Sequence, residues 1–146
     1  MKILITGAAG FIGSNVAVYL ARFGHTITAV DSLDSLLYHR EVKEVNFLRL
    51  SEFKNIETRI MDLSLDNYNF DYNFDILINF AALPGQVLSW NNLQKYLDSN
   101  VILVEKLIKS FKTAKIPHWI QASTSSVYRE TVTKGKFGAL NPSNPY

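Results

Sequence analysis

Five short apolar runs alternate with longer segments of helical periodicity, and this alternation constrains the fold more than any other feature. The runs, interpreted as buried strands, span residues 2–6, 26–30, 56–61, 76–79 and 118–122. Helices are predicted over residues 11–23, 38–50 and 93–114. Strands that alternate with helices predict βαβ units and a parallel sheet of the α/β class. With right-handed crossovers and one switch point, we expect a Rossmann-type, doubly wound sheet in the order 3-2-1-4-5.

The third helical segment carries the strongest apolar pattern. Its large apolar residues recur every three or four positions, at Leu93, Leu97, Val101, Val104, Leu107, Ile108 and Phe111. This spacing predicts one helix over residues 93–114 with a single buried face.

The first predicted strand runs directly into the segment TGAAGFIG, whose glycines are spaced GxxGxxG. At a dinucleotide site, Gly7 permits the tight turn out of the strand and Gly10 lets the backbone approach a pyrophosphate. Gly13 allows close packing of the following helix, whose free N–H groups and positive dipole end face the phosphates. The context of strand, glycine turn and helix predicts a cofactor-binding turn formed by Gly7, Gly10, Phe11, Ile12 and Gly13.

Asp31 stands at the end of the second predicted strand. A carboxylate there accepts hydrogen bonds from the adenosine ribose and repels a 2′-phosphate, which predicts NAD rather than NADP as the cofactor. The alternative is that Asp31 is a solvated turn residue without a ligand.

Composition argues against several other classes of function. The net charge of +2 is small and scattered, with no basic run for nucleic acid or an anionic membrane. The sequence has no cysteine for disulfides or thiolate metal sites, and no apolar run approaches the ~20 residues of a membrane span. His25, His39 and His118 are far apart, so no metal site is predicted. We therefore expect a cytoplasmic protein with no nucleic-acid or membrane partner.

With these residues in place, the chain resembles the extended short-chain dehydrogenase/reductase superfamily, and within it the NAD-dependent epimerase/dehydratases of nucleotide sugars. The spacing GxxGxxG is the form found in that family, and the segment VDSLDSLLYHREVKEVNFLRL is most similar to UDP-glucuronate 4-epimerases and their relatives. The resemblance covers nearly the whole chain. It implies NAD as the cofactor and a nucleotide sugar, foremost a UDP-sugar, as the substrate.

The resemblance also implies cofactor contacts in three later segments. These segments are MDLS, NFAALPG and KYLDSNV, and the implied contact residues are Asp62, Leu63, Ala81, Ala82, Leu83 and Ser99. Ala81 and Ala82 have an alternative interpretation as small residues packed in the core. Ser99 and its neighbour Asn100 have an alternative interpretation as a polar spot on a helix.

Two further segments match the catalytic motifs of the family, in which a Y-x-x-x-K tyrosine removes a proton from a sugar hydroxyl while hydride passes to the nicotinamide. The segment QASTSSVY implies that Thr124 bonds the reacting oxygen and that Ser125 and Ser126 contact the substrate. The alternative for this cluster is a capped strand-to-loop turn. The final residues, NPSNPY, resemble the start of P-x-x-P-Y-x-x-x-K, which implies that Tyr146 is the catalytic tyrosine.

The sequence ends at Tyr146, without the lysine of that motif. We therefore expect residues 1–146 to be an incomplete NAD-binding Rossmann domain, truncated before the last strands and the C-terminal substrate domain, and inactive alone. The alternative is that Tyr146 is a chance terminal residue of a complete small protein. Dimerisation through helices on one side of the sheet is common in the family, so the resemblance also implies a homodimer.

Two departures from the family pattern leave the sugar unassigned. Arg129 replaces a glycine, and PGQVLSW lacks the arginine that glucuronate epimerases favour. Two other classes of function are alternatives to an enzyme of this family. One is a non-catalytic NAD-binding module or degenerate gene product, and the other is another Rossmann-type enzyme such as a methyltransferase. The alanine pair, STSSVY and the final Pro-Tyr speak against the methyltransferase.

Overall fold

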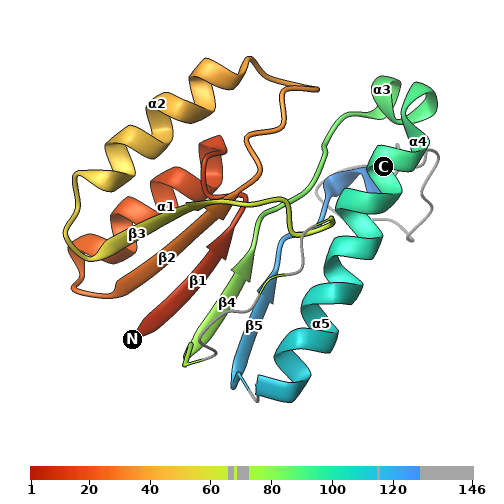
Figure 1. Ribbon diagram of the computed structural model, residues 1–146. Helices are drawn as coiled ribbons and strands as arrows, with labels where there is room; N and C mark the ends of the chain where they lie inside the picture. Colours follow the sequence, from red (N-terminus) through yellow and green to blue (C-terminus); the bar gives the residue numbers. More distant parts are fainter. Residues whose placement is uncertain (66–67, 69–72, 115, 129–146) are drawn as a thin grey trace, which may run out of the picture.

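Five parallel strands form one sheet in the order β3-β2-β1-β4-β5 (Figure 1). The computed structural model describes residues 1–65, 68, 73–114 and 116–128. The strands are β1 (Lys2–Thr6), β2 (Thr26–Asp31), β3 (Ile56–Ile60), β4 (Ile76–Asn79) and β5 (His118–Gln121). The predicted α/β class and the Rossmann-type strand order are confirmed. The five predicted strands are confirmed as well, and no strand boundary differs from its prediction by more than one residue.

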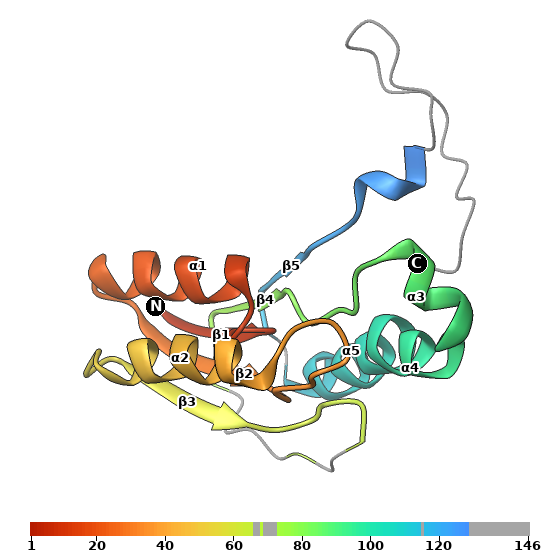
Figure 2. The same ribbon diagram turned by 90° about the horizontal axis from the view of Figure 1, so that it is seen from above.

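Helices cover both faces of this sheet (Figure 2). They are α1 (Phe11–Arg22), α2 (Arg40–Ser51), α3 (Gln86–Asn91), α4 (Leu93–Leu97) and α5 (Leu103–Ala114). A π-helical turn, η1 (Asp98–Ile102), joins α4 to α5, and a short 3-10 helix, η2 (Ser125–Tyr128), follows β5. Residues of α1 and α2 pack into one core cluster and residues of α5 into another, so the two helical layers lie on opposite faces.

The central strand β1 divides the core between these two layers. Successive side chains of a strand point to opposite faces. Ile3 and Ile5 accordingly pack with α1 and α2, whereas Leu4 packs with α5. All three side chains are almost completely buried, which identifies β1 as the centre of both cores.

The segment 93–114 differs from its prediction in two respects. It is divided into α4, η1 and α5, and its apolar residues form two stripes rather than one buried face. The buried residues are Tyr96, Leu103, Leu107 and Phe111. The residues of the outer stripe, which are between 41% and 53% exposed, are Leu93, Leu97, Val101 and Ile108. The prediction of a single buried face is wrong because the apolar arc is wider than the surface that the sheet presents to one helix.

Strand β5 is the least buried strand of the sheet. It pairs with β4, and within the described residues no strand pairs with its other edge. Ile120 is 51% exposed, although Trp119 packs edge-to-face on Phe111 with 6.3 Å between ring centroids.

In the part of the chain that the structure describes, none of the helices has the length and apolar character needed to cross a bilayer.

Candidate cofactor-binding cleft

A cavity of about 730 Å³ lies at the carboxyl ends of the strands. Its walls come from the β1–α1 turn, the loops after β2, β3 and β4, the turn η1 and the end of β5. Strand β1 leads to α1 on one face, while its neighbour β4 leads to α5 on the other, so the chain reverses direction between them. Open α/β sheets bind their ligands outside the carboxyl ends of the strands at such a switch point.

The β1–α1 turn has room for glycine alone at two positions. Gly7 has a φ of +66°, and a Cβ there would lie 2.6 Å from the carbonyl carbon of Phe80 and the nitrogen of Ala81. A Cβ at Gly13 would lie 2.3 Å from the Gly7 carbonyl oxygen. These neighbours are backbone atoms that cannot move aside. A side chain at Gly10 would meet the Gly7 oxygen at 3.2 Å, which a small residue tolerates.

Helix α1 begins at the floor of the cavity with its first turn uncapped. Gly10 is the N-cap residue, has no side chain to bond the helix, and is followed by a first turn without acidic residues. The first N–H groups of any helix have no partner within the helix. Gly10, Phe11 and Ile12 line the cavity, so this helix end presents donors and positive partial charge to it.

Asp31 is anchored beside this helix end. Its carboxylate accepts hydrogen bonds from the Ala9 N–H at 3.0 Å and the Leu33 N–H at 2.8 Å. The Nζ of Lys43 lies 3.3 Å from Oδ1. The interpretation of Asp31 as a solvated turn residue is wrong, since its side chain is 5% exposed.

The loop after β2 continues along the cavity in a fixed conformation. Leu33 has a φ of +57°, which is uncommon for a residue with a branched side chain, and its buried side chain and bond to Asp31 stabilise it there. Asp34 then accepts a hydrogen bond from the Leu36 N–H at 2.8 Å and pairs with Lys95 of α4 at 3.0 Å. This ion pair connects the loop to the opposite wall of the cavity.

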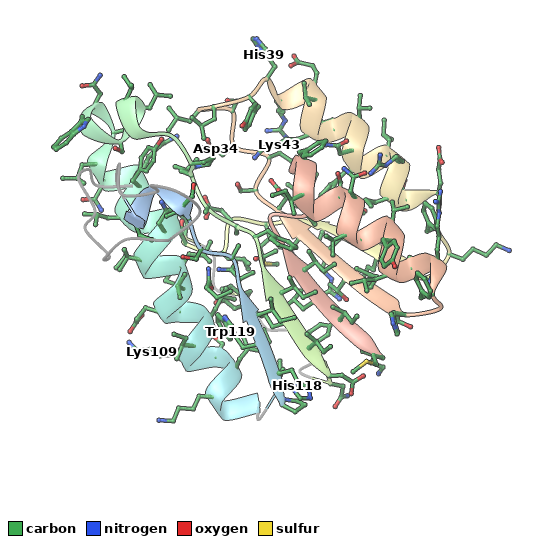
Figure 3. All side chains as sticks on the ribbon, turned by 180° about the vertical axis from the view of Figure 1, so that it is seen from behind. Asp34, His39, Lys43, Lys109, His118 and Trp119 are labelled. Carbon is green, nitrogen blue, oxygen red and sulfur yellow. The ribbon has the colours of Figure 1, made fainter. Side chains whose placement is uncertain are left out.

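The pKa of Asp34 reflects these contacts. Burial alone would raise the pKa, but the Leu36 N–H and the nearby ammonium groups of Lys95 and Lys43 outweigh that effect. The pKa of Asp34 is therefore lowered from its ordinary value. Figure 3 shows Asp34 and Lys43 on the same side of the molecule, with Lys43 extending from α2 towards Asp34.

Every residue predicted to contact the cofactor lines this one cavity. Asp62 and the buried Leu63 follow β3, and Asp62 accepts hydrogen bonds from the Ser64 N–H at 2.9 Å and the Ser64 hydroxyl at 2.6 Å. Ala81, Ala82 and Leu83 follow β4. The cavity therefore gathers the predicted residues from five separate parts of the chain.

The π-helical turn η1 brings Ser99 and Asn100 to the same cavity. The Asn100 side chain accepts a hydrogen bond from the Leu83 N–H at 2.8 Å and donates one to the Leu83 carbonyl at 3.0 Å. This two-way contact fixes the loop after β4 against the helix. Asn100 thus positions the loop after β4, and the predicted cofactor contact of Ser99 stays a prediction.

The residues predicted to be catalytic differ in their position relative to the cavity. Thr124 is half-buried and lines the cavity. Ser125 is exposed and does not line it. The side chain of Ser126 and the whole of Tyr146 lie outside the described residues, so their predicted roles stay predictions.

Sequence reasoning missed a buried polar row beneath the cavity. The Thr6 hydroxyl donates to the Asn79 side-chain oxygen, and the Asn79 amide donates to the Gln121 side-chain oxygen at 2.9 Å. Thr6, Asn79 and Gln121 are aligned on β1, β4 and β5, and the first two are fully buried. The available signal was a polar residue near the carboxyl end of each of these strands.

Two lysines of the cavity wall were also missed, because Lys43 and Lys95 look like ordinary surface residues of helices.

Within the described ranges, no group of three or more His, Cys, Asp or Glu side chains is arranged to hold a metal ion. His39 and His118 are at opposite ends of the molecule (Figure 3).

Comparison with known proteins gives concordant matches. The statistical model of the NAD dependent epimerase/dehydratase family matches residues 3–146. Protein CapI of Staphylococcus aureus is 34% identical over an alignment of 140 positions, and the match covers 92% of this chain and 41% of that protein. An uncharacterized UDP-glucose epimerase of Bacillus subtilis, YtcB, is 32% identical over an alignment of 151 positions, and the match covers 100% of this chain and 47% of YtcB.

A solved structure is also similar to this chain over nearly its whole length. The crystal structure of UDP-glucuronic acid 4-epimerase from Bacillus cereus, in complex with UDP-glucuronic acid and NAD, superposes with a TM-score of 0.84 at 29% identity. The match covers 99% of this chain and 47% of that one. The chain thus spans less than half the length of these similar proteins.

Proposed function

Because the chain belongs to the NAD-dependent epimerase/dehydratase family, we propose that it forms the cofactor-binding part of an enzyme that epimerises or dehydrates a nucleotide sugar. NAD is the cofactor of this family, and solved structures similar to the chain contain it. The observation that supports the proposal most is the convergence of every predicted cofactor residue on one cavity at the switch point of the sheet. Membership of the family also removes the methyltransferase alternative.

The residues of the cavity fit NAD. Gly10 lines the cavity without a side chain where a pyrophosphate would approach, and the uncapped end of α1 offers it N–H donors. We assign the adenosine ribose to Asp31 and the adenine to Asp62 and Leu63. The remaining predicted contacts, Ala81, Ala82, Leu83 and Ser99, would hold the nicotinamide half.

When bound, NAD supplies a hydride acceptor and donor, and the residues of this chain orient the sugar and move its proton. Thr124, in the loop after β5, would donate a hydrogen bond to the reacting sugar oxygen. Tyr146 would remove the proton from that hydroxyl. The ordinary pKa of a tyrosine is about 10, so it needs a neighbouring cation such as the lysine of the family motif to act near neutral pH.

The substrate class is proposed from the similar proteins. The names of YtcB and of the Bacillus cereus enzyme specify a UDP-glucose epimerase and a UDP-glucuronic acid 4-epimerase. We propose a UDP-sugar for this chain without choosing the sugar. The segment PGQVLSW, which overlaps α3, lacks the arginine expected of a glucuronate-specific member.

A homodimer through the outer stripe of α4, η1 and α5 is part of the proposal. The stripe, Leu93, Leu97, Val101 and Ile108, presents apolar side chains at helical spacing along one outward surface. Such a continuous apolar surface favours association. Sedimentation of the protein before and after Val101→Lys tests this, because the lysine would place a charge at the centre of the stripe. A monomer in both cases would contradict the dimer.

Titration of the 146-residue polypeptide with NAD, followed by calorimetry, tests cofactor binding. We expect saturable binding by the natural sequence and its loss in Gly10→Val, whose side chain would project towards the pyrophosphate. Gly10→Ala is the matched control, with a smaller loss of affinity. Thermal unfolding shows whether each variant remains folded. No binding of NAD by the folded natural sequence would contradict the proposal.

Incubation with NAD and UDP-sugars, followed by NMR, separates the enzyme from a non-catalytic module. We expect no turnover by the 146-residue polypeptide, because it has no residue after Tyr146 to supply the motif lysine. Steady epimerisation by this polypeptide would contradict that expectation. A lysine codon four positions downstream in the gene would support the enzyme, and its absence would support the NAD-binding module.

A further inference from the structure

Lys43 lies against the carboxylate that was expected to determine the choice of cofactor. Its Nζ is 3.3 Å from Asp31 Oδ1, and both residues line the cavity. The Lys43 side chain, which comes from α2, is 16% exposed. Its ammonium group is therefore held inside the wall of the cavity rather than in solvent (Figure 3).

The ammonium changes what Asp31 presents to a ligand. An unpaired carboxylate at the end of β2 repels a 2′-phosphate and so excludes NADP. Here the charge of Asp31 is offset by Lys43, while the Ala9 and Leu33 N–H groups occupy further acceptor positions of the carboxylate. The repulsion that an incoming phosphate meets is correspondingly weaker.

Lys43 also has donors available for a phosphate. An ammonium group carries three N–H donors, and the contact with Asp31 uses one of them. Its charge reaches the neighbouring Asp34, because it contributes to lowering the pKa of that residue. Asp34 itself is paired with Lys95 at 3.0 Å. The carboxylates of Asp31, at the end of β2, and Asp34, in the loop after it, are therefore each paired with an ammonium group.

We propose that Lys43 is a specificity-determining residue that sets the ratio of affinities for NAD and NADP. It offsets the charge of Asp31 and donates to the 2′-phosphate of NADP, so the cleft discriminates against NADP less than Asp31 alone would. The inference rests on the proposed function, and in particular on the placement of the adenosine ribose against Asp31.

Calorimetric titration of both cofactors into the 146-residue polypeptide tests this. Lys43→Met removes the charge and keeps most of the apolar stem, so we expect it to raise the ratio of Kd(NADP) to Kd(NAD) about tenfold, the effect of losing one charge-assisted contact. Lys43→Arg keeps a cation and should restore most of the natural ratio. Lys109→Met is the matched control, because Lys109 lies on α5, is not part of the cavity wall and carries the same charge.

The outcomes separate this inference from the proposed function. Absence of NAD binding to the natural sequence would overturn both. Binding of NAD with a ratio that Lys43→Met leaves unchanged, or that Lys109→Met changes equally, would overturn the role of Lys43 alone. Failure of the natural sequence to bind NADP at any attainable concentration would also overturn it, since Lys43 would then confer no tolerance.

Discussion

In the N-terminal half of the molecule (residues 1–65), β1 and β2 are buried along almost their whole length between two helical layers. In the C-terminal half (residues 73–128), the edge strand β5 has no fully buried residue. The first half contains the glycine turn, Asp31 and Lys43, which line the same cavity. The second half contributes Thr124 from the loop after an exposed strand.

In the proposed function, the contacts to the adenosine and the pyrophosphate come from the N-terminal half, and those to the nicotinamide and the sugar come from the C-terminal half. The turn proposed to bind the pyrophosphate is formed by a short continuous segment that follows the central strand. The proposed catalytic residues come from β5 and beyond, where packing within the described residues is sparse. We therefore expect the N-terminal half to tolerate substitution least. The first two predictions below test that expectation, and the last two test contacts that connect the halves.

The largest effect is expected from a methyl group in the glycine turn. Gly13→Ala would place Cβ 2.3 Å from the Gly7 carbonyl oxygen, and overpacking against the backbone should lower the free energy of unfolding by about 3 kcal/mol or more. The matched change in the C-terminal half is Gly85→Ala, where Cβ has an ordinary 3.5 Å contact and the strain comes from a φ of +107°. We expect about 1–2 kcal/mol there. Urea unfolding measures both, and equal losses would contradict the comparison.

A second pair removes the same side chain from each half. Ile5→Ala empties a fully buried position in β1 and should cost about 3 kcal/mol in free energy of unfolding. Ile120→Ala, in β5, affects a side chain that is 51% exposed and should cost less than about 1 kcal/mol. If the two variants unfold at the same urea concentration, β5 is buried by a contact outside the described residues.

The polar row beneath the cavity connects the two halves and predicts coupling between them. Thr6→Val and Asn79→Leu each leave a buried partner without its hydrogen bond. Each single variant should therefore lose about 1–2 kcal/mol of unfolding free energy, the cost of a buried polar group without a partner. The double variant removes both partners and should lose less than the sum of the single variants. Strict additivity in the double-mutant cycle would show that the two side chains act independently.

The smallest effect is expected at the ion pair between Asp34 and Lys95. The folded-state pKa of Asp34 lies below its ordinary value of 3.8, so the stabilisation is complete above that pH and is lost as the pH falls through the lowered pKa. Asp34→Asn should lower the free energy of unfolding by about 0.2–1 kcal/mol near neutral pH. The difference from the natural sequence should shrink in strong acid. If the difference in free energy of unfolding grows on acidification, the lowered pKa of Asp34 is contradicted.

Much of the fold was predictable because each strand is a compact apolar run with a turn residue or helix start at its end. The bounds of β1 and β4 agree with their predictions at both ends. The short helix α3 was not predicted, since the segment QVLSWN has no cap or apolar periodicity. The burial of the segment 93–114 was misjudged because sequence spacing identifies apolar positions without showing how wide a surface the sheet can cover.

The site was predictable where one local segment carries the chemistry, as in the glycine turn and at Asp31. The lysines that determine its charge were not. Lys43 and its partner Asp31 are separated by 12 residues, and Lys95 and Asp34 by 61. Nothing in the sequence indicates that either pair meets, because the crossovers of the sheet bring them together. The folded arrangement was needed to add these charges to the wall of the cleft.

The contact between Gly7 and the start of the loop after β4 has a consequence for recombining this chain with its relatives. The backbone of Phe80 and Ala81 occupies the space that a side chain at Gly7 would need. A chimera that takes residues 1–60 from one parent and residues from 76 onwards from another must therefore inherit matching backbone paths on both sides of this contact. Crossover points chosen within α1 or α2 would preserve each surface but not the fit between them, so this contact is one that the two parents must satisfy together.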